Sequence, residues 1–329
     1  FLLGMPLPMR LAMLLLSAGF TIFIAAAGLS LWRAPAGNPT MIGMRFAVAG
    51  LLVTIGLGLV LASNYGWAWW LTHWVQVTNL HATWGLLGWV GLLVIGVSYQ
   101  VVPMFQLTPA YPRPMTRWLS WALFSLLLSG SASFLLPEGK EQVTWVVTLL
   151  IVASFAMFAL MTLRLQLQRR RRQSDVTLLF WRFGMVCLLL ALALSLVGQA
   201  MPARTGAQQV NFMMVFLFIA GFAVSVVNGM LYKIVPFLIW FHLQSLLMGM
   251  VRVPNMKLIM PEPGMRRQMW LHFAAVPTLA LSALWPPLIY PAALLFGASM
   301  IWLELNLLYA FRIYQKNAKL APQGETSST

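Results

Sequence analysis

The chain has 329 residues, of which 60% are hydrophobic and 8% are charged. Soluble proteins are about 25% charged, so this composition excludes a pair of soluble domains. The formal net charge of +15 would suggest a nucleic-acid binder in a soluble chain. Here the basic residues lie between long apolar runs, so no nucleic-acid partner is expected. The single cysteine, Cys187, excludes a disulfide framework and a cysteine-ligated metal site.

Apolar stretches long enough to cross a bilayer, about 18 residues or more, occur nine times along the chain. Backbone amides in lipid must be hydrogen-bonded within their own segment, so each stretch is predicted to be a helix. The nine predicted spans are 11–32, 43–63, 77–102, 118–136, 143–164, 178–200, 209–240, 270–286 and 290–311. The sequence therefore predicts an all-α, polytopic transmembrane bundle of about nine helices.

The distribution of Lys and Arg predicts the orientation, because these residues accumulate on cytoplasmic loops. Nine spans place 18 of the 21 basic residues on one side and only Arg10, Lys140 and Arg204 on the other. We therefore expect a multi-pass protein of the bacterial inner membrane with a cytoplasmic C-terminus and a periplasmic visible N-terminus. Because the chain begins with Phe1 on the outer face, we also expect a missing upstream segment, with a further helix as one hypothesis.

An internal repeat is visible in the third and seventh spans, which share five identities when their residue numbers are offset by 133. The matched residues are Gly88, Gly96, Tyr99, Val102 and Pro103, and Gly221, Gly229, Tyr232, Val235 and Pro236. The glycines favour close helix packing, and each proline is predicted to end its helix. The predicted organisation is a first four-helix repeat at 1–136, a second at 137–286, and a ninth helix with a polar tail at 287–329.

The longest predicted connection is the cytoplasmic segment 243–268, which belongs to the second repeat. It carries five methionines among basic residues. We interpret it as a segment that lies on the bilayer surface, with metal handling as the alternative.

His81 is the candidate ligand that the sequence singles out. It lies a turn or two inside the outer end of the third span and precedes a glycine-rich apolar run. Intramembrane polar groups are costly and therefore often functional, and a neutral histidine can ligate haem iron or copper. The alternative is a structural histidine whose ring is satisfied by a neighbouring carbonyl.

These residues carry a resemblance to a known family. His81-Ala82-Thr83-Trp84, the glycines at 85, 88, 91 and 96, and Tyr99-Gln100-Val101-Val102-Pro103 resemble the second helix of haem-copper oxidase catalytic subunits, especially the nitric oxide reductase branch. The loop 109–113 is similar to the family's loop that contains Pro and Arg. The resemblance implies haem b near the outer face with His81 as an axial ligand, and copper as a further possible cofactor.

The departures from this family limit the expected chemistry. The copper-binding pattern His-Pro-Glu-Val-Tyr is replaced by Ser225-Val226-Val227-Asn228-Gly229-Met230, and the family's His-His pair is reduced to His272. An oxygen- or NO-reducing binuclear centre is therefore not expected, and the chain resembles short, NnrS-like members of the superfamily. His242 and His272 are interpreted as interfacial residues.

The second axial ligand has two candidates. Met214 is related to His81 by the same offset of 133, so it stands at the equivalent position of the second repeat, although plain packing is the alternative for a methionine. His73 precedes His81 by eight residues and becomes possible if the chain bends back near Trp74. Glu304 is the carboxylate well inside a predicted span; it is either a neutral structural residue or a proton relay.

The expected function is electron transfer, gas sensing or a response to nitrosative or copper stress, without an oxygen- or NO-reducing binuclear centre. The expected partners are the lipid bilayer and a respiratory-chain or periplasmic electron-transfer protein. The alternatives are a transporter or permease in which His81 and Glu304 serve substrate or protons, and a cofactor-free accessory or assembly subunit of a respiratory complex.

Overall fold

The computed structural model describes residues 6–35, 37–67, 73–133, 140–170, 175–201, 206–247 and 253–320. These residues are almost entirely helical and contain no β-strand, which confirms the predicted all-α class. Within them, seven helices are long and apolar enough to cross a membrane. The chain is therefore a helical membrane bundle, and the count of seven differs from the nine predicted spans.

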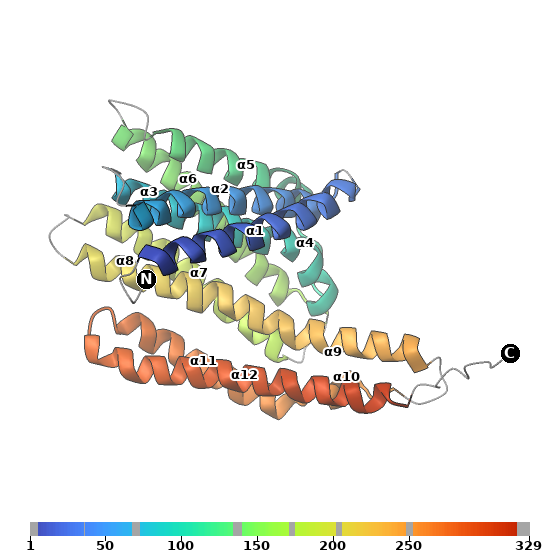
Figure 1. Cartoon of the computed structure of the whole chain (residues 1–329). Coiled ribbons are helices and arrows are strands. Elements are labelled where there is room, and N and C mark those ends of the chain that lie inside the picture. The colour runs from blue at the N-terminus through green and yellow to red at the C-terminus, as the bar shows by residue number, and fades with distance from the viewer. Residues whose placement is uncertain are drawn as a thin grey trace. The chain divides into compact units, whose positions relative to one another are not determined.

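The elements in chain order are α1 (Pro6–Arg33), α2 (Pro39–Trp67), α3 (Trp74–Thr83), the π-helix η1 (Trp84–Gly91), α4 (Leu92–Gln106), α5 (Arg113–Ala132), α6 (Lys140–Leu167), α7 (Val176–Ala200), α8 (Ala207–Phe216), the π-helix η3 (Leu217–Val224), α9 (Ser225–Leu247), α10 (Met256–Ile259), α11 (Glu262–Leu281), the 3₁₀-helix η4 (Pro286–Leu288) and α12 (Ile289–Ala318). Figure 1 shows this succession. The elements α3, η1 and α4 form one continuous span, as do α8, η3 and α9.

The two predicted spans outside the seven correspond to α5 and α11, which have 20 residues each. Both helices are less apolar than the seven candidate spans, because charged residues occupy their first turns. The helix α11 begins at Glu262, inside the expected interfacial segment 243–268, with Pro263 at a position that favours a helix start. That segment is therefore largely helical rather than one long connection, since α9 continues to Leu247; residues 248–252 lie outside the described part of the chain.

The prolines of the repeat do not end their helices, contrary to the prediction. Pro103 lies inside α4, which continues to Gln106, and Pro236 lies inside α9, which continues to Leu247. A proline removes one amide donor, and membrane helices tolerate this loss where neighbouring groups compensate for it. The helix α4 instead ends at Leu107, which adopts a left-handed conformation with φ of 56°.

The chain divides into two compact units, Phe1–Arg170 with α1 to α6 and Arg171–Thr329 with α7 to α12. The boundary predicted from the repeat, 136–137, lies inside the first unit, between α5 and α6. The helix α6 packs on α5, and the hydroxyl oxygens of Ser133 and Thr144 are 3.4 Å apart. The units are described separately because their relative position is not determined.

The two units repeat the same helix geometry. The elements α3, η1 and α4 begin at 74, 84 and 92, whereas α8, η3 and α9 begin at 207, 217 and 225, so all three starts keep the offset of 133. The π-helical segments therefore occur at equivalent positions of the two copies. Such segments are rare and are often found at functional sites.

Close packing is repeated as well. A Cβ built on Gly50 would lie 2.3 Å from the carbonyl oxygen of Gly88, so α2 and η1 meet backbone to backbone. In the second unit, a Cβ on Gly221 would lie 2.7 Å from that of Cys187, which is the counterpart of Gly50. Small residues allow this approach between membrane helices.

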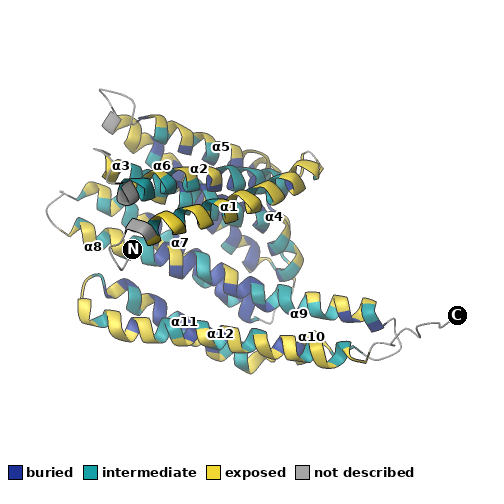
Figure 2. Cartoon of the chain, in the orientation of Figure 1, coloured by how far each residue is buried: buried dark blue, intermediate teal, exposed yellow. Residues whose placement is uncertain are grey.

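Large apolar side chains are exposed along several helices, and the exposed residues are coloured yellow on the ribbon of Figure 2. The apolar stretch of α1 has none of its residues buried. Trp32 of α1 is 85% exposed, and Leu294 of α12 is 75% exposed. A surface of this kind is stable only against an apolar solvent, which indicates contact with the lipid bilayer.

Candidate functional site

His81 lies in the last turn of α3, seven residues after the helix begins at Trp74. Its Nδ1 is 2.9 Å from the carbonyl oxygen of Thr54 on α2. A carbonyl oxygen only accepts hydrogen bonds, so Nδ1 carries the proton and donates it. The other ring nitrogen, Nε2, is then an acceptor, and no described residue hydrogen-bonds to it. This arrangement satisfies one side of the ring and leaves the metal-binding side available.

The His81 ring forms part of the wall of a cavity of about 240 Å³ between α1, α2 and η1. Gly58 of α2 makes room for the ring, because a Cβ at this position would lie 2.9 Å from His81 Cε1. The cavity wall is mostly apolar. Besides His81, Met13 of α1 is the lining residue with an atom that commonly binds transition metals. Sequence reasoning missed Met13 because nothing in the pattern of α1 distinguishes it from packing residues.

The remaining predicted ligands lie elsewhere. His73 is exposed at the start of α3, and this helix runs without a bend from Trp74 to Thr83. His73 is therefore about 12 Å from His81 along the helix axis and is not brought to the cavity. Met214 is half-buried in α8, seven residues after its start, and so occupies the counterpart of the His81 position. It belongs to the second unit, so its pairing with His81 stays a prediction.

Glu304 lies on α12 within the span 286–318 and is exposed. It makes no hydrogen bond or ion pair with any described residue. His242 is exposed near the end of α9, where its ring stacks on Tyr314 with centroids 5.5 Å apart. Neither residue belongs to a cluster of ligands, since the described chain holds no group of three or more His, Cys, Asp or Glu residues that fits a metal ion.

His272 is fully buried, which corrects the expectation that it lies at a membrane interface. The reason is the early start of α11, which places His272 ten residues inside the helix. Its Nε2 is 2.9 Å from Ser225 Oγ on α9. The aromatic rings of Phe180 and Phe296 surround it, at centroid distances of 5.6 and 6.0 Å.

The His272–Ser225 pair lies near a second group of hydrogen-bonded polar residues in the second unit, which sequence reasoning missed. Gly264, Gln268 and His272 follow one another on one face of α11, a turn apart. The hydrogen bonds of this second group run from Asn306 Nδ2 to Tyr232 Oη (2.9 Å), from Tyr232 Oη to Gln268 Oε1 (3.2 Å), and from Gln268 Nε2 to Ser299 Oγ (2.9 Å). Asn228 lies on α9 between Ser225 and Tyr232, with its Nδ2 buried and unpartnered. We call the seven polar residues of the two groups the polar ladder: Ser225, Asn228, Tyr232, Gln268, His272, Ser299 and Asn306.

The first unit carries apolar residues at four positions of the polar ladder, whereas Tyr99 matches Tyr232. Trp121 and Phe124 of α5 match Trp270 and Phe273 of α11 at an offset of 149, which places Leu119 opposite Gln268 and Leu123 opposite His272. On the preceding span, the offset of 133 places Leu92 and Ile95 opposite Ser225 and Asn228. Aligning the two copies position by position is the sequence signal that would have found the ladder.

At the end of the second unit where α7 and α11 begin, Asp175 caps α7. Its carboxylate accepts a hydrogen bond from the amide of Leu178 (3.0 Å) and pairs with Lys233 Nζ (2.9 Å). Lys233 follows Tyr232 of the ladder directly. At the same end, a Cβ on Gly264 would lie 2.7 Å from Asn306 Oδ1, so only glycine leaves this amide room.

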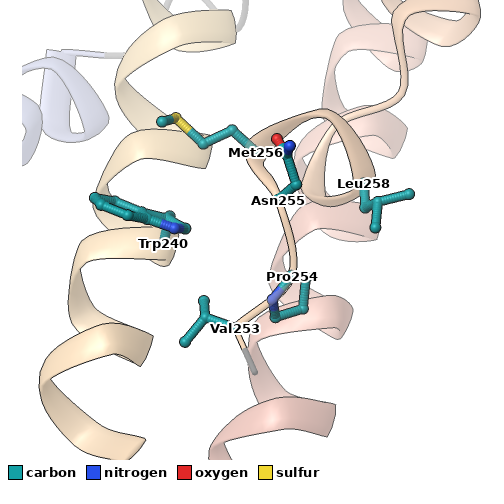
Figure 3. Close-up of a pocket in the computed structure, with 6 residues that line it drawn as sticks. All are labelled: Trp240, Val253, Pro254, Asn255, Met256 and Leu258. Carbon is teal, nitrogen blue, oxygen red and sulfur yellow. The ribbon is translucent and has the colours of Figure 1, made fainter. Parts of the chain in front are cut away.

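A cavity of about 730 Å³ lies between α9 and the segment that precedes and begins α10. Trp240 faces this segment across the cavity in Figure 3, where the other lining residues are Val253, Pro254, Asn255, Met256 and Leu258. Met256 belongs to the methionine-rich segment that was considered for metal handling. Met248 and Met250 of that segment lie outside the described residues.

Comparison with known proteins adds no family to this picture. The chain matches no protein-family model, and no curated protein matches it.

Proposed function

We propose that this chain is a nine-crossing protein of the bacterial inner membrane that binds haem b through His81 near the periplasmic face. The observation that carries the proposal is the hydrogen bond from His81 Nδ1 to the Thr54 carbonyl, at 2.9 Å, with Nε2 left without a partner among the described residues at an apolar cavity. Metal-bound histidines commonly donate their second nitrogen to such a carbonyl, which fixes the ring and raises its basicity. The resemblance of 81–103 to haem-copper oxidase subunits supports the same assignment.

The His81 imidazole and the Met13 thioether at this cavity are donors that haem iron accepts. The volume of the cavity, however, limits how haem could enter it. At about 240 Å³ the cavity is smaller than the roughly 300–1,000 Å³ of sites that enclose drug-sized ligands. A macrocycle therefore requires α1 to move away from α2. The helix α1 packs chiefly on α2, and none of the residues in its apolar stretch is buried, so its displacement would expose little buried surface of α1 itself.

Haem would supply one-electron redox chemistry at this site. The protein's part is to present His81 Nε2, to hold the imidazole orientation through Thr54, and to exclude water by the apolar walls. The resulting function is electron transfer or gas sensing in nitrosative or copper stress, with a respiratory or periplasmic partner and without a binuclear centre. A copper ion is the alternative occupant, because imidazole and thioether donors also suit copper.

The decisive experiment is a reduced-minus-oxidised spectrum and a pyridine haemochrome assay, with metal analysis, on protein purified from haem-replete cells. We expect a Soret band and about one haem per chain. His81→Ala should abolish the band, whereas His242→Ala, which alters an exposed histidine far along α9, should retain it. A colourless preparation with no Soret band would rule out the haem proposal.

The polar ladder favours a second candidate, a proton-coupled transporter. Because the first unit builds the same helix packing with leucine and isoleucine at four of these positions, the fold does not require polar residues there. Buried polar groups in a membrane are costly and usually serve a function. The polar residues are spaced from Tyr232, at the end of the unit near Lys233, to His272, ten residues inside α11, so a proton entering from that side would cross one gap, between Gln268 and His272.

This candidate is tested in liposomes that contain the purified protein and a pH-sensitive dye, under a potassium diffusion potential. We expect faster internal acidification than in protein-free liposomes. Gln268→Leu and His272→Leu, which introduce the first unit's own residues, should remove the difference. Gln106→Leu changes a buried glutamine of the first unit and serves as the control. Equal rates with and without the protein would exclude a transmembrane proton path.

A further inference from the structure

A groove of about 440 Å³ lies on the second unit between α11 and α12. It is lined by Arg267, Trp270, Leu271 and Ala274 of α11 and by Trp302 of α12. The four α11 residues have the spacing i, i+3, i+4 and i+7, which places them along one face of the helix. Ala274 is exposed and has a small side chain, and Trp270 is 63% exposed.

Arg267 gives the groove a positive charge that no described residue neutralises. It is exposed and makes no ion pair or hydrogen bond within the described chain. The adjacent Arg266 differs, because its guanidinium pairs with Glu262 at 2.7 Å. An unpaired guanidinium beside apolar membrane-facing surface is unfavourable, so an anion is expected beside Arg267.

The groove has the polarity of a phospholipid. Arg267 is five residues after the start of α11, about 7–8 Å along the helix, and Ala274 lies about 10 Å further toward its other end. A phosphate at Arg267 would receive two parallel hydrogen bonds from the guanidinium. An acyl chain would continue along Leu271 and Ala274. Tryptophans such as Trp270 and Trp302 are favoured where headgroups meet hydrocarbon.

The first unit shows that the shared fold does not produce this groove chemistry by itself. At the offset of 149, Trp118 stands where the second unit has Arg267, and Ser125 stands where it has Ala274. Ala153 stands at the position of Trp302. The cation and the second indole are therefore specific to the second unit.

We propose that this groove binds one anionic phospholipid, with its phosphate on Arg267 and an acyl chain against Leu271 and Ala274. Basic pockets between transmembrane helices bind such headgroups by charge and shape together. The proposal rests on the groove and its unpaired charge and does not depend on haem.

The test uses the delipidated full chain in detergent and follows thermal unfolding by tryptophan fluorescence. Phosphatidylglycerol should raise Tm by at least about 3 °C more than phosphatidylcholine does, because a ligand that binds only the folded state stabilises it. Arg267→Gln should remove this difference. Arg266→Gln, the matched control one residue away, should retain it. Ala274→Leu, which fills the groove without a change of charge, should also remove it.

Equal Tm shifts with the two lipids in the unmodified chain would overturn the proposal, as would an Arg267→Gln variant that behaves like Arg266→Gln. The Tm shift in inorganic phosphate distinguishes binding of the whole lipid from binding of its phosphate alone. If phosphate alone reproduces the phosphatidylglycerol shift, the site binds an anion but no acyl chain, and the lipid assignment is wrong.

Discussion

The Nδ1 atom of His81 lies 2.9 Å from the carbonyl oxygen of Thr54 on the neighbouring helix α2. This one contact defines the tautomer of the ring, because only a protonated Nδ1 can donate to the carbonyl. It also ties the ring to the segment of α2 that carries Gly58, whose missing side chain makes the approach possible.

Gly58→Ala should disturb this contact. Its Cβ would lie 2.9 Å from His81 Cε1, so the ring or the helix must shift, at a cost of about 1–3 kcal/mol. Gly56→Ala on the same helix is the control, because nothing lies within 4 Å of its Cβ and alanine favours the helix by about 1 kcal/mol. The unfolding temperature and the haem content should both fall for Gly58→Ala and not for Gly56→Ala. Similar results for the two variants would contradict the close contact between Gly58 and the His81 ring.

If His81 ligates haem as proposed, two matched variants identify the residue that supplies the second axial ligand. Met13 and His81 border one cavity, and each lies seven residues after the start of its helix. We therefore expect Met13→Leu to shift the reduced haem spectrum and to change the ligand-field signals of the oxidised form. Met214→Leu should produce this change instead if the repeat-based pairing is right. Unchanged spectra in both variants would exclude a methionine ligand, while the haem assignment itself would still depend on His81→Ala.

Ser225 and His272 should show coupled energetics. Removal of either partner leaves the other buried without its hydrogen bond, which costs about 1–3 kcal/mol. The double variant Ser225→Ala, His272→Leu should cost less than the sum of the single changes, with a coupling energy of about 0.5–3 kcal/mol. Unfolding free energies of the four proteins in detergent give this quantity, and strict additivity would show that the contact is energetically unimportant.

Tyr111, in the loop between α4 and α5, should make the first unit sensitive to high pH. Burial raises the pKa of its phenol above the usual value, while its hydrogen bond with Thr162, at 2.8 Å, has a smaller opposing effect. Because the pKa of the phenol is higher in the folded than in the unfolded protein, Tyr111 contributes its full stability to the fold below pH 10, the pKa of the unfolded chain. This contribution is lost as the pH rises above that value. Tyr111→Phe should unfold at a lower temperature at pH 7 yet lose less stability between pH 9 and 11. Parallel pH profiles of Tm would contradict this assignment.

The periodic features of the fold were predictable from local sequence. Apolar length alone identified the seven helices that can span a membrane, and it also identified the positions of α5 and α11. The repeat offset of 133 anticipated that α3, η1 and α4 correspond to α8, η3 and α9, although the π-helical geometry left no recognisable sequence signal. The repeated stack of Phe46 on Phe124 and of Phe183 on Phe273, with centroids 4.6 and 4.1 Å apart, follows from the same duplication.

Other features depended on contacts between distant segments. Pro103 was predicted to end a helix because proline lacks an amide donor, but helices packed in a membrane compensate for that loss. His272 was placed at an interface because the charged first turns of α11 hid the true start of the helix.

The sequence by itself determined the class of the protein, the positions of its helices, the duplication and the singular status of His81, because hydrophobic length and residue identity are local properties. Only the tertiary structure decided what each polar residue faces. It joined His81 to Thr54 and placed Met13 at the same cavity. It also connected Gln268 to Tyr232 and Ser299, and placed Arg267 in a groove where no described residue pairs with it. These relations depend on which helix faces pack together, and a helix of apolar residues does not encode its packing face when lipid and protein interior are equally apolar.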